Sequence, residues 1–254
     1  FIKNSNEILV ETAEYKETLF RLDYLAKTKG FVLLTGSPGK GKTTALRSWS
    51  ASLNPSLYKV VYSSLSTLTL NDFYRNLIHE FGAEPAFKKP DNFRIIQEEI
   101  TRLSVEKRKT PVIIMDEANY IGNGILNDLK ILFNFEMDSR DRAVVLLAGL
   151  PKLNSTLSLG IHEPLKQRIV MNYNLEGLSK DEAHLYVTEK LNGAGCNQTV
   201  FEEAALEAVI NAADGIPRML NKYCNASMLI GDSKNTNLIT TDIVMQAVND
   251  CELG

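Results

Sequence analysis

Short apolar runs alternate with longer segments of helical periodicity along the first two thirds of the chain. The runs lie at 31–35, 58–62, 111–115 and 143–148, with a weaker fifth run at 168–173. Apolar runs of this length predict strands buried on both faces, as in a parallel sheet. The segments at 12–27, 42–53, 70–81, 92–107 and 125–138 predict helices that cover this sheet.

The pattern changes after residue 174, where only helical periodicity remains. Helix starts are indicated there by two sequences of capping-box form and by two further breaks: Ser179-x-x-Glu182, Thr199-x-x-Glu202, Gly215-Ile-Pro217 and Thr240-Thr241. We therefore expect an α/β domain at 1–174, with a parallel sheet between helices, and a small all-α lid domain at 175–254.

A glycine-rich turn joins the first predicted strand to the next helix. It reads Gly36-Ser37-Pro38-Gly39-Lys40-Gly41-Lys42-Thr43, followed by Thr44, and fits the pattern G-x-x-x-x-G-K-[ST] in its required strand–turn–helix context. Glycines let backbone N–H groups surround phosphates, and the helix N-terminus adds a favourable dipole. We expect Lys42 to neutralise the β- and γ-phosphates and the Thr43 hydroxyl to bind Mg²⁺.

Two carboxylates, Asp116 and Glu117, follow the third predicted strand directly. Because the C-terminal ends of parallel strands meet at one edge of a sheet, we expect this pair beside the glycine-rich turn. Asp116 would hold Mg²⁺, directly or through water, and Glu117 would orient the attacking water. Adjacent Asp and Glu, without an Asn-Lys-x-Asp motif, favour an ATPase over a GTPase. The predicted cofactors are ATP and Mg²⁺.

The composition is that of an ordinary globular protein, with 44% hydrophobic and 23% charged residues in 254. The net charge of −3 argues against a generally basic surface but not against a local basic stripe. Three widely spaced cysteines without metal-ligand spacing predict reduced thiols and a cytoplasmic location. No apolar run reaches the roughly 20 residues of a membrane span. Because the chain starts at Phe1, we expect further sequence upstream.

Together with these motifs, four stretches resemble the ExeA/TnsC-like group of the AAA+ superfamily, and the likeness covers nearly the whole chain. They read LTGSPGKGKTTALR at 34–47, STLTLNDFYR at 66–75, DLKILFNFEMDS at 128–139 and QRI at 167–169. The group includes ATPases that serve transposases and a secretion-associated branch. The resemblance implies an AAA+ fold with nucleotide at the junction of the two domains.

The resemblance also implies roles for two arginines. Arg218, in Gly215-Ile-Pro-Arg218, would be the lid arginine that reaches the γ-phosphate. Arg168 would be a finger acting on ATP in a neighbouring subunit. One departure is that Leu150 stands where a polar residue usually closes the fourth strand. Either Asn154 or a neighbouring loop replaces it, or hydrolysis is slow.

Three functions remain open, two of which the resemblance implies. The leading hypothesis is a regulator of DNA transposition that self-assembles into a ring or helical filament on duplex DNA and recruits a transposase. Lys88-Lys89 and 107–109 are candidate DNA contacts, although such clusters are usually solvated loops. The alternatives are an ExeA-like secretion ATPase and an ATP-gated binding switch with slow hydrolysis.

Overall fold

A computed structural model describes residues 8–64 and 68–252. The chain forms two compact units. The sheet unit contains 18–38 and 42–175, and the helical unit contains the described residues of 1–17, 39–41 and 176–254. The predicted domain boundary at 174 and 175 stays a prediction.

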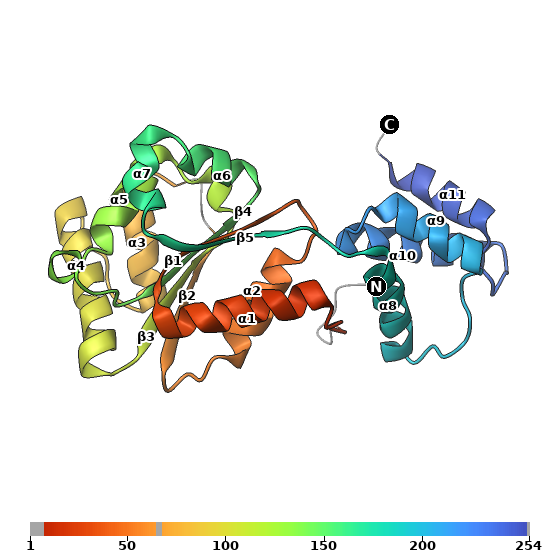
Figure 1. Cartoon of the computed structure of the whole chain (residues 1–254), viewed down its shortest axis with the longest axis horizontal. Coiled ribbons are helices and arrows are strands. Elements are labelled where there is room, and N and C mark those ends of the chain that lie inside the picture. The colour runs from red at the N-terminus through yellow and green to blue at the C-terminus, as the bar shows by residue number, and fades with distance from the viewer. Residues whose placement is uncertain (1–7, 65–67, 253–254) are drawn as a thin grey trace. The chain divides into compact units, whose positions relative to one another are not determined.

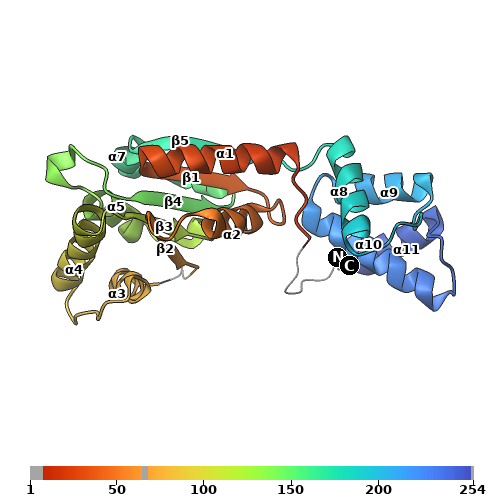
Figure 2. The ribbon, with the colours of Figure 1, turned by 90° about the horizontal axis from the view of Figure 1, so that it is seen from below.

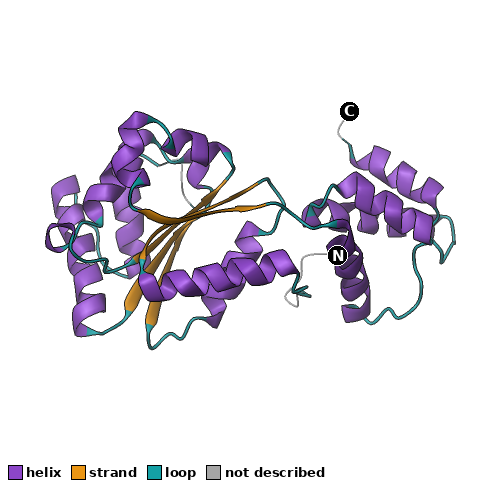
Figure 3. Cartoon of the chain, in the orientation of Figure 1, coloured by secondary structure: helices purple, strands orange, loops and turns teal. Residues whose placement is uncertain are grey.

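Five parallel strands form the centre of the sheet unit, in the order β2-β3-β4-β1-β5 (Figure 1). Their bounds are β1 Gly30–Gly36, β2 Tyr58–Ser63, β3 Thr110–Met115, β4 Val144–Gly149 and β5 Ile169–Leu175. All four neighbouring pairs are parallel. The strands, drawn in orange in Figure 3, all belong to this unit. The predicted fold class, a parallel sheet between helices with a helical C-terminal region, is confirmed.

Helices cover both faces of the sheet because alternate strand residues point to opposite sides. Phe31 and Leu33 of β1 pack in one apolar cluster, whereas Val32 and Leu34 pack in another. One face is covered by α1 Ala13–Thr28 and α2 Lys42–Ser52. The other face is covered by α3 Leu70–Phe81, α4 Lys89–Thr101, α5 Asn123–Leu132, α6 Lys152–Leu157 and α7 Glu163–Lys166. Helices α3 and α4 lie side by side (Figure 2).

Short segments complete the sheet unit. The predicted helix at 92–107 is observed as α4 followed by the π-helical η1 Arg102–Glu106. Three single turns of 3₁₀ helix follow strands or helices: η2 Ala118–Tyr120, η3 Glu136–Asp138 and η4 Gly160–His162.

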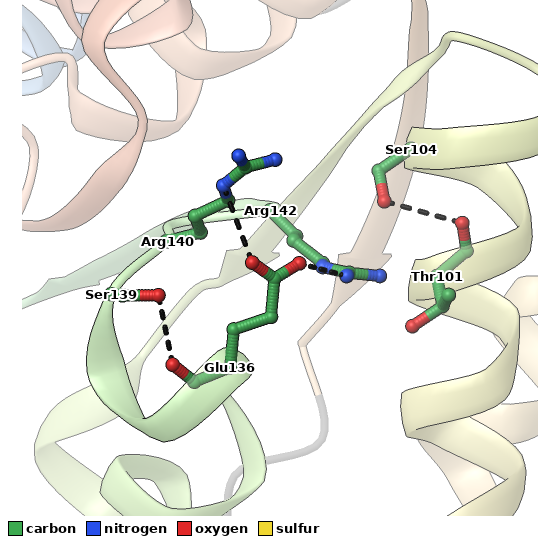
Figure 4. A network of polar contacts seen from close by, with 6 residues as sticks. All are labelled: Thr101, Ser104, Glu136, Ser139, Arg140 and Arg142. Carbon is green, nitrogen blue, oxygen red and sulfur yellow. Dashed lines mark hydrogen bonds and ion pairs between the residues drawn. The ribbon is translucent and has the colours of Figure 1, made fainter.

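The helix predicted at 125–138 is wrong beyond Leu132. Phe133 and Phe135 are both buried, and two inward side chains at this spacing do not fit a helix. Glu136 and Met137 then have positive φ. The Glu136 carboxylate stabilises the turn, as Figure 4 shows: it accepts a hydrogen bond from Arg142 Nη2 at 2.5 Å and forms an ion pair with Arg140, whose Nε lies 3.2 Å away.

Four helices form the helical unit around an apolar core of their own. They are α8 Lys180–Gly193, α9 Glu203–Ala213, α10 Pro217–Ser233 and α11 Thr241–Cys251. The predicted capping box of Ser179 and Glu182 is confirmed at the start of α8. None of the helices within the described residues combines the length and apolarity needed to cross a bilayer.

The second predicted capping box, Thr199 with Glu202, is wrong. Glu202 is itself the residue before α9, and no side chain caps that helix. The reason is a short parallel bridge between Phe201 and Ile239, in which the Glu202 N–H donates to the Ile239 carbonyl at 3.0 Å. The bridge holds the chain extended where the capping box would have begun a helix.

Candidate nucleotide-binding site

The glycine-rich turn connects the end of β1 to the start of α2. Strand β1 ends at Gly36 and α2 begins at Lys42. Gly39 and Gly41 have φ of +82° and +96°, where residues with side chains are strained. The remaining predicted nucleotide contacts lie in the same turn or just after it: Ser37, Pro38, Lys40 and, in the first turn of α2, Thr43 and Thr44. The backbone therefore has the strand–turn–helix form that the motif predicts.

Lys42 lies inside this turn. Its side chain is buried, at 8% exposure. The ammonium donates to the carbonyl oxygens of Gly36 at 2.7 Å and Ser37 at 3.1 Å. Because electrostatic interactions are stronger away from bulk water, a phosphate in the turn would meet a strongly attractive cation.

The end of β3 lies beside the first turn of α2. Asp116 is buried, at 4% exposure of the residue. Its Oδ2 atom accepts hydrogen bonds from the Thr43 hydroxyl at 2.8 Å and the Tyr62 phenol at 3.1 Å. Its Oδ1 atom accepts from the Glu117 N–H at 2.9 Å. Thr43 and Asp116, named from two separate motifs, are thus in direct contact.

The Thr43 and Asp116 oxygens fit the requirements of Mg²⁺, which prefers hard oxygen ligands and retains several waters. Nucleotide phosphates would supply further ligands at such a site. Within 8–64 and 68–252, no group of three or more His, Cys, Asp or Glu side chains could hold a metal alone. Thr43 and Asp116 would supply two oxygen ligands, and phosphate oxygens and waters would supply the rest.

Glu117 differs from Asp116 in both exposure and backbone conformation. It is exposed and has φ 53° and ψ 34°, in the left-handed region that non-glycine residues seldom adopt. Such a conformation costs on the order of 1–3 kcal/mol and is often found at functional sites. The turn presents Glu117 to solvent immediately after a buried carboxylate, which suits a residue that acts on water.

The position after β4 has no polar side chain, as the sequence indicates. The Leu150 N–H instead donates to Asn119 Oδ1 at 2.9 Å. Asn154, the predicted substitute, donates to the Thr35 hydroxyl at 3.0 Å and accepts from Asn172 at 2.9 Å. Because Thr35 directly precedes Gly36, Asn154 is connected to the end of the phosphate-loop strand.

The two predicted arginines lie in different units. The Arg168 guanidinium donates to the Lys130 carbonyl at 2.7 Å, and burial lowers its pKa from the ordinary value. Arg168 is therefore bound to the last turn of α5 in its own chain. Within the helical unit, the Arg218 N–H donates to the Gly39 carbonyl at 3.3 Å.

The lysine clusters considered for DNA binding are partly engaged within the chain. Lys89 forms an ion pair with Asp128, and Lys109 donates to the Pro55 carbonyl at 2.8 Å. Lys88 is exposed. The ion pair offsets the charge of Lys89, and the hydrogen bond directs the Lys109 ammonium toward its own backbone.

Tyr62 contacts Asp116 at this site, and the sequence does not predict that contact. Burial, followed by the negative charge of Asp116, raises its pKa to about 12, so the phenol remains a proton donor at neutral pH. The only signal in the sequence is its place near the end of β2, one of five positions in the unremarkable run YKVVY. No motif marks it.

A parallel sheet with a phosphate-binding turn after β1 and an acidic pair after β3 defines a P-loop protein of the AAA+ type. Residues 25–157 match the family model of the AAA domain. The chain belongs to this family.

Among curated proteins, the chain is similar to General secretion pathway protein A of Aeromonas hydrophila. The two are 31% identical over 244 residues, which cover 94% of this chain and 44% of that protein. The chain thus spans less than half the length of this relative. The ExeA-like side of the predicted resemblance is supported, and the TnsC-like side is not shown.

Among solved structures, the fold is similar to Cdc6p of Pyrobaculum aerophilum, with TM-score 0.76, 14% identity and coverage of 99% of this chain and 70% of that one. The ORC1 protein of Aeropyrum pernix in complex with DNA is also similar, with TM-score 0.67, 17% identity and coverage of 96% and 66%. At these identities the likeness concerns the fold alone.

Proposed function

We propose that this chain binds ATP with Mg²⁺ and hydrolyses it. The observation that carries the proposal is the contact between the Thr43 hydroxyl and Asp116, which joins the phosphate-binding turn to the acidic strand end. In this proposal Lys42 and the backbone of 36–44 bind the phosphates. Mg²⁺ supplies a positive charge that neutralises the charge developing during phosphoryl transfer.

Three further side chains contribute to the proposed reaction. Glu117 orients and polarises the attacking water. Arg218 and Arg168 stabilise charge on the phosphates, Arg168 from a neighbouring copy in a ring or helical filament. Because Leu150 offers no polar side chain to the attacking water, either Asn154 on α6 or a neighbouring loop replaces it, or turnover is slow.

Lys42→Ala tests nucleotide binding directly, because it removes the cation inside the turn. Binding of a fluorescent ATP analogue with Mg²⁺ should be lost, whereas Lys27→Ala, on the exposed face of α1, should bind like the parent. Equal affinity of the Lys42 variant and the parent would overturn the assignment of the phosphate-binding turn.

We further propose that the chain is the ATPase module of a secretion-associated protein. The similarity to General secretion pathway protein A along 94% of the chain supports this role over the transposition role that the sequence had favoured. A chimera of the Aeromonas protein, with this chain in place of its matching region, should restore secretion in cells that lack that protein. The Lys42→Ala chimera should not, and a folded, ATP-hydrolysing chimera that fails would contradict the role.

DNA binding is the competing function, suggested by the fold similarity to an ORC1 protein solved with DNA. A transposition regulator would bind duplex DNA in its ATP state, recruit a transposase, and lose affinity steeply with salt. Fluorescence anisotropy with labelled duplex, an ATP analogue and a salt series decides between the two. Tight, ATP-dependent binding would overturn the secretion proposal.

A further inference from the structure

We infer that Tyr62 is a positioning residue for the Mg²⁺ site. Its phenol holds the Asp116 carboxylate in one orientation and leaves a single acceptor position free for the metal or a metal-bound water. The inference deepens the proposed Mg²⁺–ATP function and rests on it.

The hydrogen bonds to Asp116 account for most of its acceptor capacity. An ionised carboxylate offers about four lone-pair sites on its two oxygens. Thr43 and Tyr62 occupy Oδ2, and the Glu117 N–H occupies one site on Oδ1. In the described part of the chain these are the three donors to Asp116, so one site on Oδ1 remains.

The sheet explains why Tyr62 reaches this carboxylate. Strand β2 pairs with β3 in register, with Tyr62 opposite Ile114. The pairing continues one residue beyond β3, where the Asp116 N–H donates to the Ser63 carbonyl at 2.9 Å. Backbone hydrogen bonds therefore hold the main chains of Tyr62 and Asp116 side by side, which brings the phenol within reach of the carboxylate.

Loss of the phenol would leave Oδ2 with the Thr43 hydroxyl as its donor. That hydroxyl is itself expected to bind the metal, so it cannot fix the carboxylate independently of the ion. Residues that orient a metal ligand typically change metal affinity 10- to 100-fold when mutated. Because Tyr62 is 41% exposed, removal of one hydroxyl should leave the core intact.

The test measures binding of a non-hydrolysable ATP analogue by calorimetry over a range of Mg²⁺ concentrations. In Tyr62→Phe, half-maximal enhancement of binding should require roughly tenfold more Mg²⁺. Affinity without Mg²⁺, and affinity at saturating Mg²⁺, should match the parent. Tyr24→Phe, which removes an exposed phenol on α1, is the matched control and should show no change.

Three results would overturn the inference or its basis. An unchanged Mg²⁺ requirement in Tyr62→Phe would show that the phenol does not position the site. Equal loss of affinity with and without Mg²⁺ would indicate general damage to nucleotide binding. Mg²⁺-independent binding by the parent protein would contradict the proposed function itself, before any variant is compared.

Discussion

The Thr43 hydroxyl donates to Asp116 across 2.8 Å, although 73 residues separate them in the chain. Thr43 is in the first turn of α2 and Asp116 follows β3. The contact joins the glycine-rich turn, which we propose binds phosphate, to the strand end that carries the two carboxylates. Glu117, next to Asp116, is thereby placed near the reacting phosphate if nucleotide occupies the turn.

Glu117→Gln should bind ATP with parental affinity and hydrolyse it at least 100-fold more slowly, since general acid–base catalysis contributes about 10²–10⁴-fold. The change removes a carboxylate and keeps the shape of the side chain. Phosphate release and analogue binding are the two measurements, with Glu98→Gln on α4 as the control. Turnover at the parental rate would assign the water-activating role to another group.

Gly39→Ala should destabilise the protein more than Gly41→Ala. Both glycines have positive φ, so each alanine costs about 1–2 kcal/mol for a left-handed backbone. A Cβ on Gly39 would also lie 2.7 Å from Arg218 Cβ and 2.9 Å from Ile216 Cγ2, whereas one on Gly41 meets nothing within 4 Å. Thermal unfolding followed by circular dichroism should show the larger decrease in Tm for Gly39→Ala, and equal decreases would contradict the close approach.

His162 should make the protein less stable in mild acid. Its side chain is fully buried, and burial lowers its pKa below the ordinary value of about 6.5. The unfolded chain then binds more protons than the folded one between the lowered pKa and about 6.5. The free energy of unfolding therefore falls as the pH drops below about 6.5.

Urea unfolding at pH 7.5 and 5.5 measures this effect. The loss of stability between the two pH values should be smaller in His162→Gln than in the parent, because glutamine does not titrate. His79→Gln, at an exposed position on α3, should keep the parental pH dependence. An unchanged difference in His162→Gln would assign the acid sensitivity to other groups.

Arg168 should act on ATP in a neighbouring copy even though it contacts Lys130 in its own chain. Arg168→Ala should bind ATP, slow its turnover and lower stability by about 1 kcal/mol through the lost hydrogen bond. Mixing it with Lys42→Ala, which retains the arginine but not the nucleotide, should restore turnover. Ultracentrifugation with an ATP analogue should show assembly of the parent, and a strictly monomeric protein would exclude this role.

The sequence predicts the sheet well because buried parallel strands produce apolar runs that helices interrupt. It also predicts the contact between the two motifs, since strand ends in a parallel sheet converge at one edge. Arg168 was harder to place. Its contact with Lys130 depends on how α5 packs beside the end of α7, and no local pattern encodes that packing.

The errors have a common cause in tertiary contacts. Phe133 and Phe135 continue a run of apolar residues, yet burial of both residues ends the helix. The sequence from Thr199 to Glu202 has the pattern of a capping box, but the bridge between Phe201 and Ile239 keeps this segment extended, and α9 begins later, at Glu203. Tyr62 was missed because a single tyrosine in a strand has no motif, and its role is visible only beside Asp116.

The position of β4 between β1 and β3 determines the width of the site. Adjacent strands are roughly 4.8 Å apart, so the main-chain hydrogen bonds of the sheet hold the start of the glycine-rich turn and the acidic pair two strand intervals apart. The order of the strands in the sheet sets this separation. Substitutions on the outer surfaces of the helices should therefore leave the spacing between the glycine-rich turn and the acidic pair unchanged.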